Sequence, residues 1–187
     1  PYVGCAFLGG IALDESTREA ARKLRARDRT EFLPTDPIAF IDEQLAALSA
    51  VDIRPGVNVR SATVDPIGAA GAICERHDAI LEINAHCRQE EMCAAGAGEA
   101  LLADADRLET YAAAAAETGA TVSVKVRAEV PGVDLPALSS RLADVGVDLM
   151  HVDAMDSEPI IEDIVAAVPD VDVLANNGVR DRETVEE

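Results

Sequence analysis

A histidine and a cysteine stand side by side where an apolar stretch of the chain ends. The segment LEINAHCRQEEMCAAGAGEALL, residues 81–102, starts as a strand-like run and then presents Asn84, His86, Cys87 and Arg88. A histidine and an arginine beside Cys87 are neighbours that favour a reactive thiol. The alternatives are a small buried thiol with an exposed loop histidine, or a metal site. A metal site is the least favoured of these, because no second pair of ligands follows at zinc spacing.

A lysine inside a run of valines is the second candidate for chemistry. The segment TVSVKVR, residues 121–127, places Lys125 and Arg127 on the same face of a predicted strand. An ammonium group is costly to bury unless it meets an anion or a functional partner. The alternative is a lysine that extends from the strand end into solvent. Only one other lysine, Lys23, occurs in the chain, which favours a functional interpretation of Lys125.

The segment LANNGVRD, residues 174–181, contains the third candidate. Asn176, Asn177 and Gly178 follow a predicted strand, and such a turn can direct backbone N–H groups outward to hold a phosphate. The alternative is a simple turn, for which Asn-Gly is a common choice.

These side chains must be positioned by alternating strands and helices. Apolar runs predict seven strands, at residues 2–10, 30–34, 56–61, 79–84, 121–127, 148–153 and 170–178. Segments with helical spacing follow the strands, the last of them at residues 180–187. Short connections of this kind are typical of parallel strands joined by helices.

A doubly wound sheet and a (βα)8 TIM barrel both fit this pattern. Polar residues at the strand ends favour the barrel, whose active site lies at that end. These residues are Asn58, Asn84 with Cys87, Lys125 with Arg127, Asp153 and Asn176. No G-x-G-x-x-G follows the first strand, which disfavours dinucleotide binding. We therefore expect residues 1–187 to form a single TIM-barrel domain of about seven strand–helix units, with the eighth missing.

The charge of the chain is strongly negative, with 35 acidic and 16 basic residues and a formal net charge of −19. The acids are spread along the helical segments, as on the solvated surface of a protein from the salty cytoplasm of a halophilic archaeon. An acidic partner-binding face is the alternative, but no block of like charge stands out. The excess of acidic over basic residues disfavours nucleic-acid binding through a broad basic patch. With no signal peptide and no apolar run of about 18 residues, we expect a cytoplasmic protein with free thiols.

Taken together, the motifs resemble those of the dihydrouridine synthase family and of archaeal TIM-barrel proteins related to it. That family's fourth-strand motif, N-x-G-C-P followed by G-x-G-x-x-L-L, is similar to NAHCRQEEMCAAGAGEALL at residues 84–102. Its V-x-V-K-[IV]-R motif is matched by VSVKVR at 122–127, its A-N-G-D-I motif is approached by ANNGV at 175–179, and its V-Q motif appears as Val57–Asn58.

The resemblance implies an FMN-dependent oxidoreductase that reduces the C5–C6 double bond of a uracil-type base. Cys87 would be the general acid, and Asn84 and Arg127 would hold the base. The cofactor-binding residues would be Asn58, Lys125, Asp153, Asn176, Asn177 and Gly178, with Lys125 stabilising negative charge on the reduced flavin. The resemblance also implies tRNA or a free pyrimidine as substrate and NAD(P)H as electron donor.

The chain departs from the family pattern at two of these motifs. The family's G-C-P stands here as His86-Cys87-Arg88, and its sixth-strand H-G-R as Asp153-Ala154-Met155. Asp153 thus replaces a histidine that contacts flavin, while His151 lies on the same predicted strand face. Two alternatives stay open: a flavin barrel of the dihydroorotate dehydrogenase type, and a non-catalytic barrel scaffold.

Overall fold

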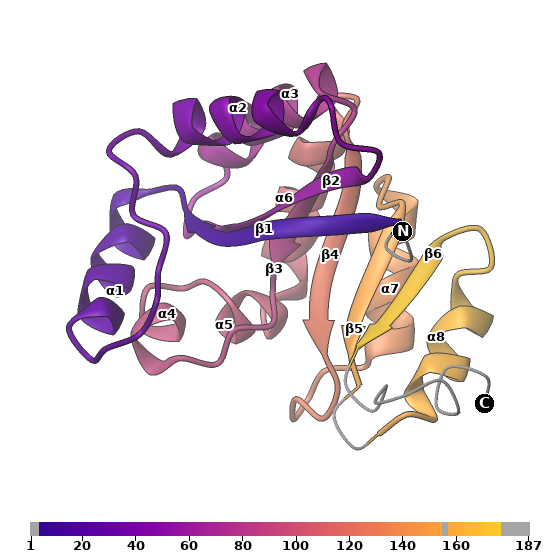
Figure 1. Cartoon of the computed structure of the whole chain (residues 1–187). Coiled ribbons are helices and arrows are strands. Elements are labelled where there is room, and N and C mark those ends of the chain that lie inside the picture. Colours follow the sequence, from indigo (N-terminus) through magenta and orange to yellow (C-terminus); the bar gives the residue numbers. More distant parts are fainter. Residues whose placement is uncertain (1–3, 155–156, 177–187) are drawn as a thin grey trace, which may run out of the picture.

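The computed structural model describes residues 4–154 and 157–176 as one parallel sheet with connecting helices (Figure 1). The strands are β1 (Cys5–Ala12), β2 (Arg54–Arg60), β3 (Ile80–Asn84), β4 (Thr121–Arg127), β5 (Leu149–Asp153) and β6 (Asp172–Asn176). The helices are α1 (Glu15–Arg25), α2 (Pro37–Leu48), α3 (Asp65–Arg76), α4 (Glu90–Ala94), α5 (Glu99–Leu102), α6 (Ala105–Ala116), α7 (Leu135–Asp144) and α8 (Ile160–Ala167).

The six strands pair in the order in which they occur in the chain, and every pair is parallel. The register aligns Asn58 of β2 with Glu82 of β3, and Glu82 with Ser123 of β4. Because side chains of aligned residues share one face of a sheet, three polar groups of separate strands are brought together there.

The sheet curls so that β1 and β5 face each other across this polar side. The ring of Phe7 in β1 lies 5.8 Å from the ring of His151 in β5, measured between centroids. Three strands separate β1 from β5 in the sheet, so a flat sheet would keep these rings far apart. The curl encloses the polar side chains, and His151 is only 7% exposed.

Aspartates begin four of the helices. Each accepts a hydrogen bond from a backbone N–H in the first turn, which satisfies donors that have no partner within the helix. They are Asp14 before α1, Asp36 before α2, Asp104 before α6 and Asp134 before α7. Part of the acidic excess therefore stabilises helix starts rather than forming a binding face.

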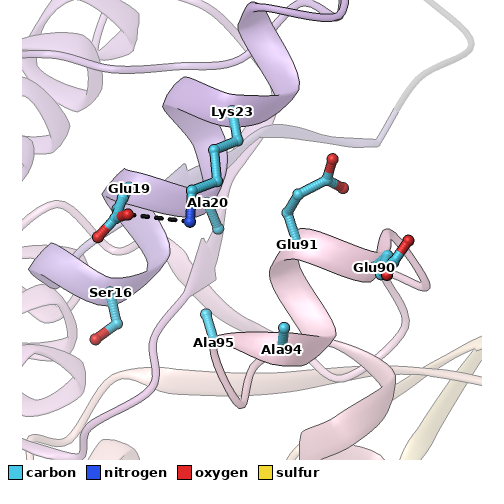
Figure 2. Close-up of a pocket in the computed structure, with 8 residues that line it drawn as sticks. All are labelled: Ser16, Glu19, Ala20, Lys23, Glu90, Glu91, Ala94 and Ala95. Atoms are coloured by element: carbon cyan, nitrogen blue, oxygen red, sulfur yellow. Dashed lines mark ion pairs between the residues drawn. The ribbon is translucent and has the colours of Figure 1, made fainter.

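Helix α1 packs against the short helix α4 at one side of the sheet. Ala20 and Leu24 of α1 join Met92 of α4 in a small apolar cluster. A hollow of about 430 Å³ lies between the two helices (Figure 2). Its lining is Ser16, Glu19, Ala20, Lys23, Glu90, Glu91, Ala94 and Ala95. It contains none of the residues predicted to carry chemistry, so we regard it as a solvated groove.

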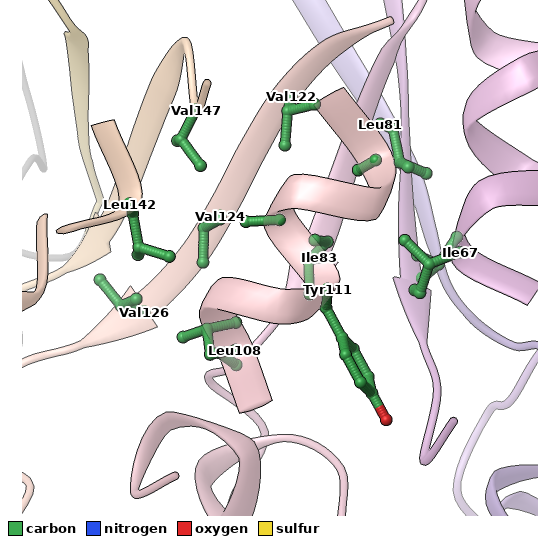
Figure 3. Packing of buried hydrophobic residues seen from close by; sticks show 14 of the residues in the cluster. Ile67, Leu81, Ile83, Leu108, Tyr111, Val122, Val124, Val126, Leu142 and Val147 are labelled. Carbon is green, nitrogen blue, oxygen red and sulfur yellow. The ribbon is translucent and has the colours of Figure 1, made fainter. Parts of the chain in front are cut away.

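The apolar face of the sheet packs against helices and forms the main core. Val122, Val124 and Val126 of β4 alternate with the polar residues of that strand and are fully buried. Leu108 of α6 and Leu142 of α7 belong to the same cluster (Figure 3). The two faces of β4 thus have opposite characters, as the alternation of valine and polar residues predicts.

The prediction of a (βα)8 barrel is wrong. The described residues form a single six-stranded sheet, and β1 and β6 are not paired with each other, as closure would require. The strand predicted at 30–34 supplies only one isolated bridge, between Phe32 and Ile11. Its short apolar run ends at Pro34, which has no N–H to donate to a strand ladder. The helix predicted at 180–187 lies outside the described residues.

No helix in the described part of the chain is long and apolar enough to cross a membrane.

Candidate functional site

A buried carboxylate lies at the centre of the polar face. Glu82 is 1% exposed. Its Oε1 accepts a hydrogen bond from Asn58 Nδ2 at 2.7 Å, and its Oε2 accepts one from Ser123 Oγ at 3.0 Å. Oε2 also lies 2.6 Å from Nδ1 of His151. Four strands therefore meet at one carboxylate, and each of its oxygens has a partner.

The surroundings of Glu82 favour its ionised form. Burial alone would raise the pKa of this carboxyl, because it penalises the charge. Three neighbouring groups lower the pKa instead. His151 does so through its hydrogen bond and its charge, Asn58 through the hydrogen bond of its amide, and Lys125 through its positive charge. The net result is a pKa below the ordinary value for glutamate. The polar face thus contains a fixed negative charge balanced by basic side chains.

Asn84 connects this network to the loop that contains Cys87. Its Nδ2 donates to Asn58 Oδ1 at 2.9 Å. Its Oδ1 accepts the backbone N–H of His86 at 3.2 Å and that of Cys87 at 3.0 Å. Both ends of the Asn84 amide are therefore occupied within the protein. Asn84 fixes the backbone that presents Cys87, a role that the sequence prediction of base binding did not include.

Two adjoining cavities open on this face. The first, called the Lys125 cavity, has a volume of about 250 Å³. It is lined by Phe7, Gly9, Gly10, Asn58, Arg60, Glu82, Asn84, His86, Lys125 and His151. The second, called the Cys87 cavity, has a volume of about 430 Å³. It is lined by Arg29, Glu31, Arg60, Asn84, His86, Cys87, Arg88, Gln89, Arg127 and Asp153. Arg60, Asn84 and His86 line both.

A second histidine–carboxylate pair stands between the cavities. Nε2 of His86 lies 2.5 Å from Oδ2 of Asp153, across the ends of β3 and β5. Burial lowers the pKa of His86, and the positive charges of Lys125 and Arg127 lower it further. The hydrogen bond and negative charge of Asp153 raise it. The net pKa of His86 is below its ordinary value, which favours the neutral imidazole at neutral pH.

The structure brings most of the predicted site residues together. Cys87, Asn84, Arg127 and Asp153 line the Cys87 cavity, while Asn58 and Lys125 line the Lys125 cavity. Asn176 ends β6 and lines neither cavity, and Asn177 and Gly178 lie outside the described residues.

Sequence reasoning missed four charged residues of the site, namely Glu82, Arg29, Arg60 and Glu31. Glu82 is a single acid inside the apolar run of β3, a pattern that could have indicated a buried partner for a base. Arg29 and Arg60 come from segments far from Cys87 in the chain, and only the fold shows that they line its cavity.

Comparisons with known proteins give little guidance about function. No known protein family matches the chain. An uncharacterized protein of Methanocaldococcus jannaschii is 29% identical over 122 residues, which cover 64% of this chain and 47% of that protein. The chain thus spans about half the length of the curated relative it matches.

Replacing Asp153 with asparagine should lower the pKa of His86 further. The substitution removes the negative charge that opposes the effect of burial. Titration of the His86 ring followed by NMR would measure the change. Asp42→Asn, which removes a carboxylate beside His77, should leave His86 unchanged. An unaltered His86 titration in Asp153→Asn would show that the pair does not form in solution.

Replacing Glu82 with glutamine should make stability less dependent on acid pH. The folded pKa of Glu82 is lowered, so its ionisation stabilises the fold above the ordinary value of 4.5, and this contribution is lost as pH falls through the folded pKa. Urea unfolding should show a smaller loss of stability below about pH 5 in Glu82→Gln than in the wild type.

The same substitution should lower the unfolding free energy at neutral pH by about 1.5–3 kcal/mol, because His151 loses an ionised partner. The exposed Glu43→Gln in α2 serves as control, and its pH profile should match the wild type. Equal acid sensitivity in Glu82→Gln and the wild type would contradict an ionised Glu82.

Proposed function

We propose that the protein is an FMN-dependent oxidoreductase that reduces the C5–C6 double bond of a uracil-type base. In this proposal, the isoalloxazine ring of FMN occupies the Lys125 cavity and the base occupies the Cys87 cavity. The observation that supports it best is the adjacency of the two cavities. They share Arg60, Asn84 and His86, with the lysine in one and the cysteine in the other.

Three features of the Lys125 cavity fit a bound flavin. Lys125 lines it, and its side chain forms no hydrogen bond or ion pair within residues 4–154 and 157–176, so its ammonium group is available to a ligand. Asn58 also lines it, and one of its two amide N–H groups is left for a ligand after the hydrogen bond to Glu82. Nε of Arg60 is buried without a partner in the described part of the chain, as expected of a donor that meets a ligand acceptor.

The side chains have separate roles in this scheme. Bound FMN would supply the hydride. Cys87 would give a proton to the neighbouring carbon of the base, while Asn84 holds the Cys87 backbone in position. Arg127 would contact the base from the floor of the cavity, where its side chain is 9% exposed and lies 3.7 Å from Glu99. Lys125 would stabilise the negative charge that develops on reduction.

The substrate could be free or part of a tRNA, and NAD(P)H would return the electrons. A site of this kind needs a two-electron donor after each turnover, and a reduced nicotinamide is the common one for flavin enzymes.

Flavin binding is the direct test. The full chain, mixed with FMN and freed of excess ligand, should keep the visible absorption bands of flavin. Lys125→Ala should weaken FMN binding by about tenfold or more, because a charge-assisted contact is lost. Lys23→Ala is the matched control, since Lys23 is the only other lysine and its side chain is 62% exposed on α1.

A wild-type protein that stays colourless with added FMN would contradict the flavoenzyme proposal. Equal FMN binding by Lys125→Ala and Lys23→Ala would show that Lys125 does not contribute to cofactor binding.

A further inference from the structure

The Cys87 cavity is a positive site on a very acidic protein. Four arginines line it, against the two carboxylates of Glu31 and Asp153. The chain as a whole carries a formal charge of −19. Such a concentration of guanidinium groups in a concave site raises the local concentration of small anions.

Two of the four arginines have no partner in the part of the chain that the structure describes. Arg60 pairs with Glu31 at 2.5 Å, and Arg127 lies 3.7 Å from Glu99. Arg29 and Arg88 are exposed and form no ion pair or side-chain hydrogen bond within residues 4–154 and 157–176.

Four of the twelve arginines in the described residues have no ion pair. Those with an ion pair are Arg22, Arg27, Arg54, Arg60, Arg76, Arg107, Arg127 and Arg141. Those without one are Arg18, Arg25, Arg29 and Arg88. Two of these four arginines line the same cavity, in a chain with more than twice as many acids as bases. Their position indicates that a ligand, rather than a protein carboxylate, is their counter-ion.

We propose that Arg29 and Arg88 bind a phosphate monoester on a mononucleotide-sized ligand in the Cys87 cavity. The planar guanidinium donates two parallel hydrogen bonds to phosphate oxygens, and two such groups match the charge of a phosphate dianion. Assigning this phosphate to the substrate rests on the proposed function, whereas anion binding at these arginines does not depend on a flavin.

Two observations favour a small ligand over a long polyanion. A volume of about 430 Å³ lies within the range of small-molecule sites. The chain as a whole has a formal net charge of −19, which repels an extended phosphate backbone more strongly than a single phosphate that enters the arginine-lined cavity.

Calorimetric titration of the full chain with uridine 5′-monophosphate and with uridine tests the proposal. The wild type should bind the monophosphate at least about tenfold more tightly than uridine. The double variant Arg29→Gln/Arg88→Gln should bind the two ligands equally. Arg25→Gln is the matched control, because Arg25 is exposed, unpaired in the described residues and does not line the cavity.

A parallel titration with FMN and riboflavin separates the two sources of phosphate. If the double variant binds FMN as weakly as riboflavin and keeps its preference for uridine monophosphate, the arginines hold the cofactor, and the assignment to substrate is overturned. A preference for uridine monophosphate that depends on Arg29 and Arg88 supports the proposal, whether or not flavin binds. Absence of flavin binding would contradict only the proposed redox function. Equal binding of monophosphate and uridine by the wild type overturns the proposal.

Discussion

The buried carboxylate of Glu82 is the constraint on which the polar face of the sheet depends. An ionised group with 1% exposure is tolerated only where hydrogen bonds and positive charge replace water. Here Asn58, Ser123 and His151 supply those contacts from three other strands. Removing one partner would leave an uncompensated charge, so the strand register and the curl of the sheet are tied to this residue.

The same network determines where the reactive groups lie. Asn58 contacts Glu82 and, through Asn84, the backbone of Cys87, so that a continuous chain of hydrogen bonds runs from the middle of the sheet to the backbone N–H of Cys87. The apolar face contributes nothing to this chemistry and instead binds the helices. The two faces of the sheet therefore have different roles. The valines on the helix-covered face stabilise the fold, and the polar residues that alternate with them line the two cavities.

Local pattern predicted most elements of the described chain, because alternation and helical spacing are local properties. The closed barrel was wrong, because closure depends on pairing between the first and last strands, which no local pattern reports. Polar residues at strand ends indicated Cys87 and Lys125 as candidates for chemistry, and the structure places the two residues in neighbouring cavities. Glu82 could have been recognised as an acid inside an apolar strand, but its partners Asn58, Ser123 and His151 come from three other strands, which only the fold brings together. Arg29 and Arg60 were missed because only the fold brings them to Cys87.

The most direct test of this account is the anaerobic reoxidation of protein-bound reduced FMN by uridine 5′-monophosphate. The return of flavin absorbance would be followed in the wild type and in Cys87→Ala. If Cys87 is the general acid, the wild type should reoxidise with formation of the 5,6-dihydro product, and the rate in the variant should be at least about a hundredfold lower, since a positioned acid contributes that much. Equal rates in the two proteins, or no reoxidation in either, would contradict this account.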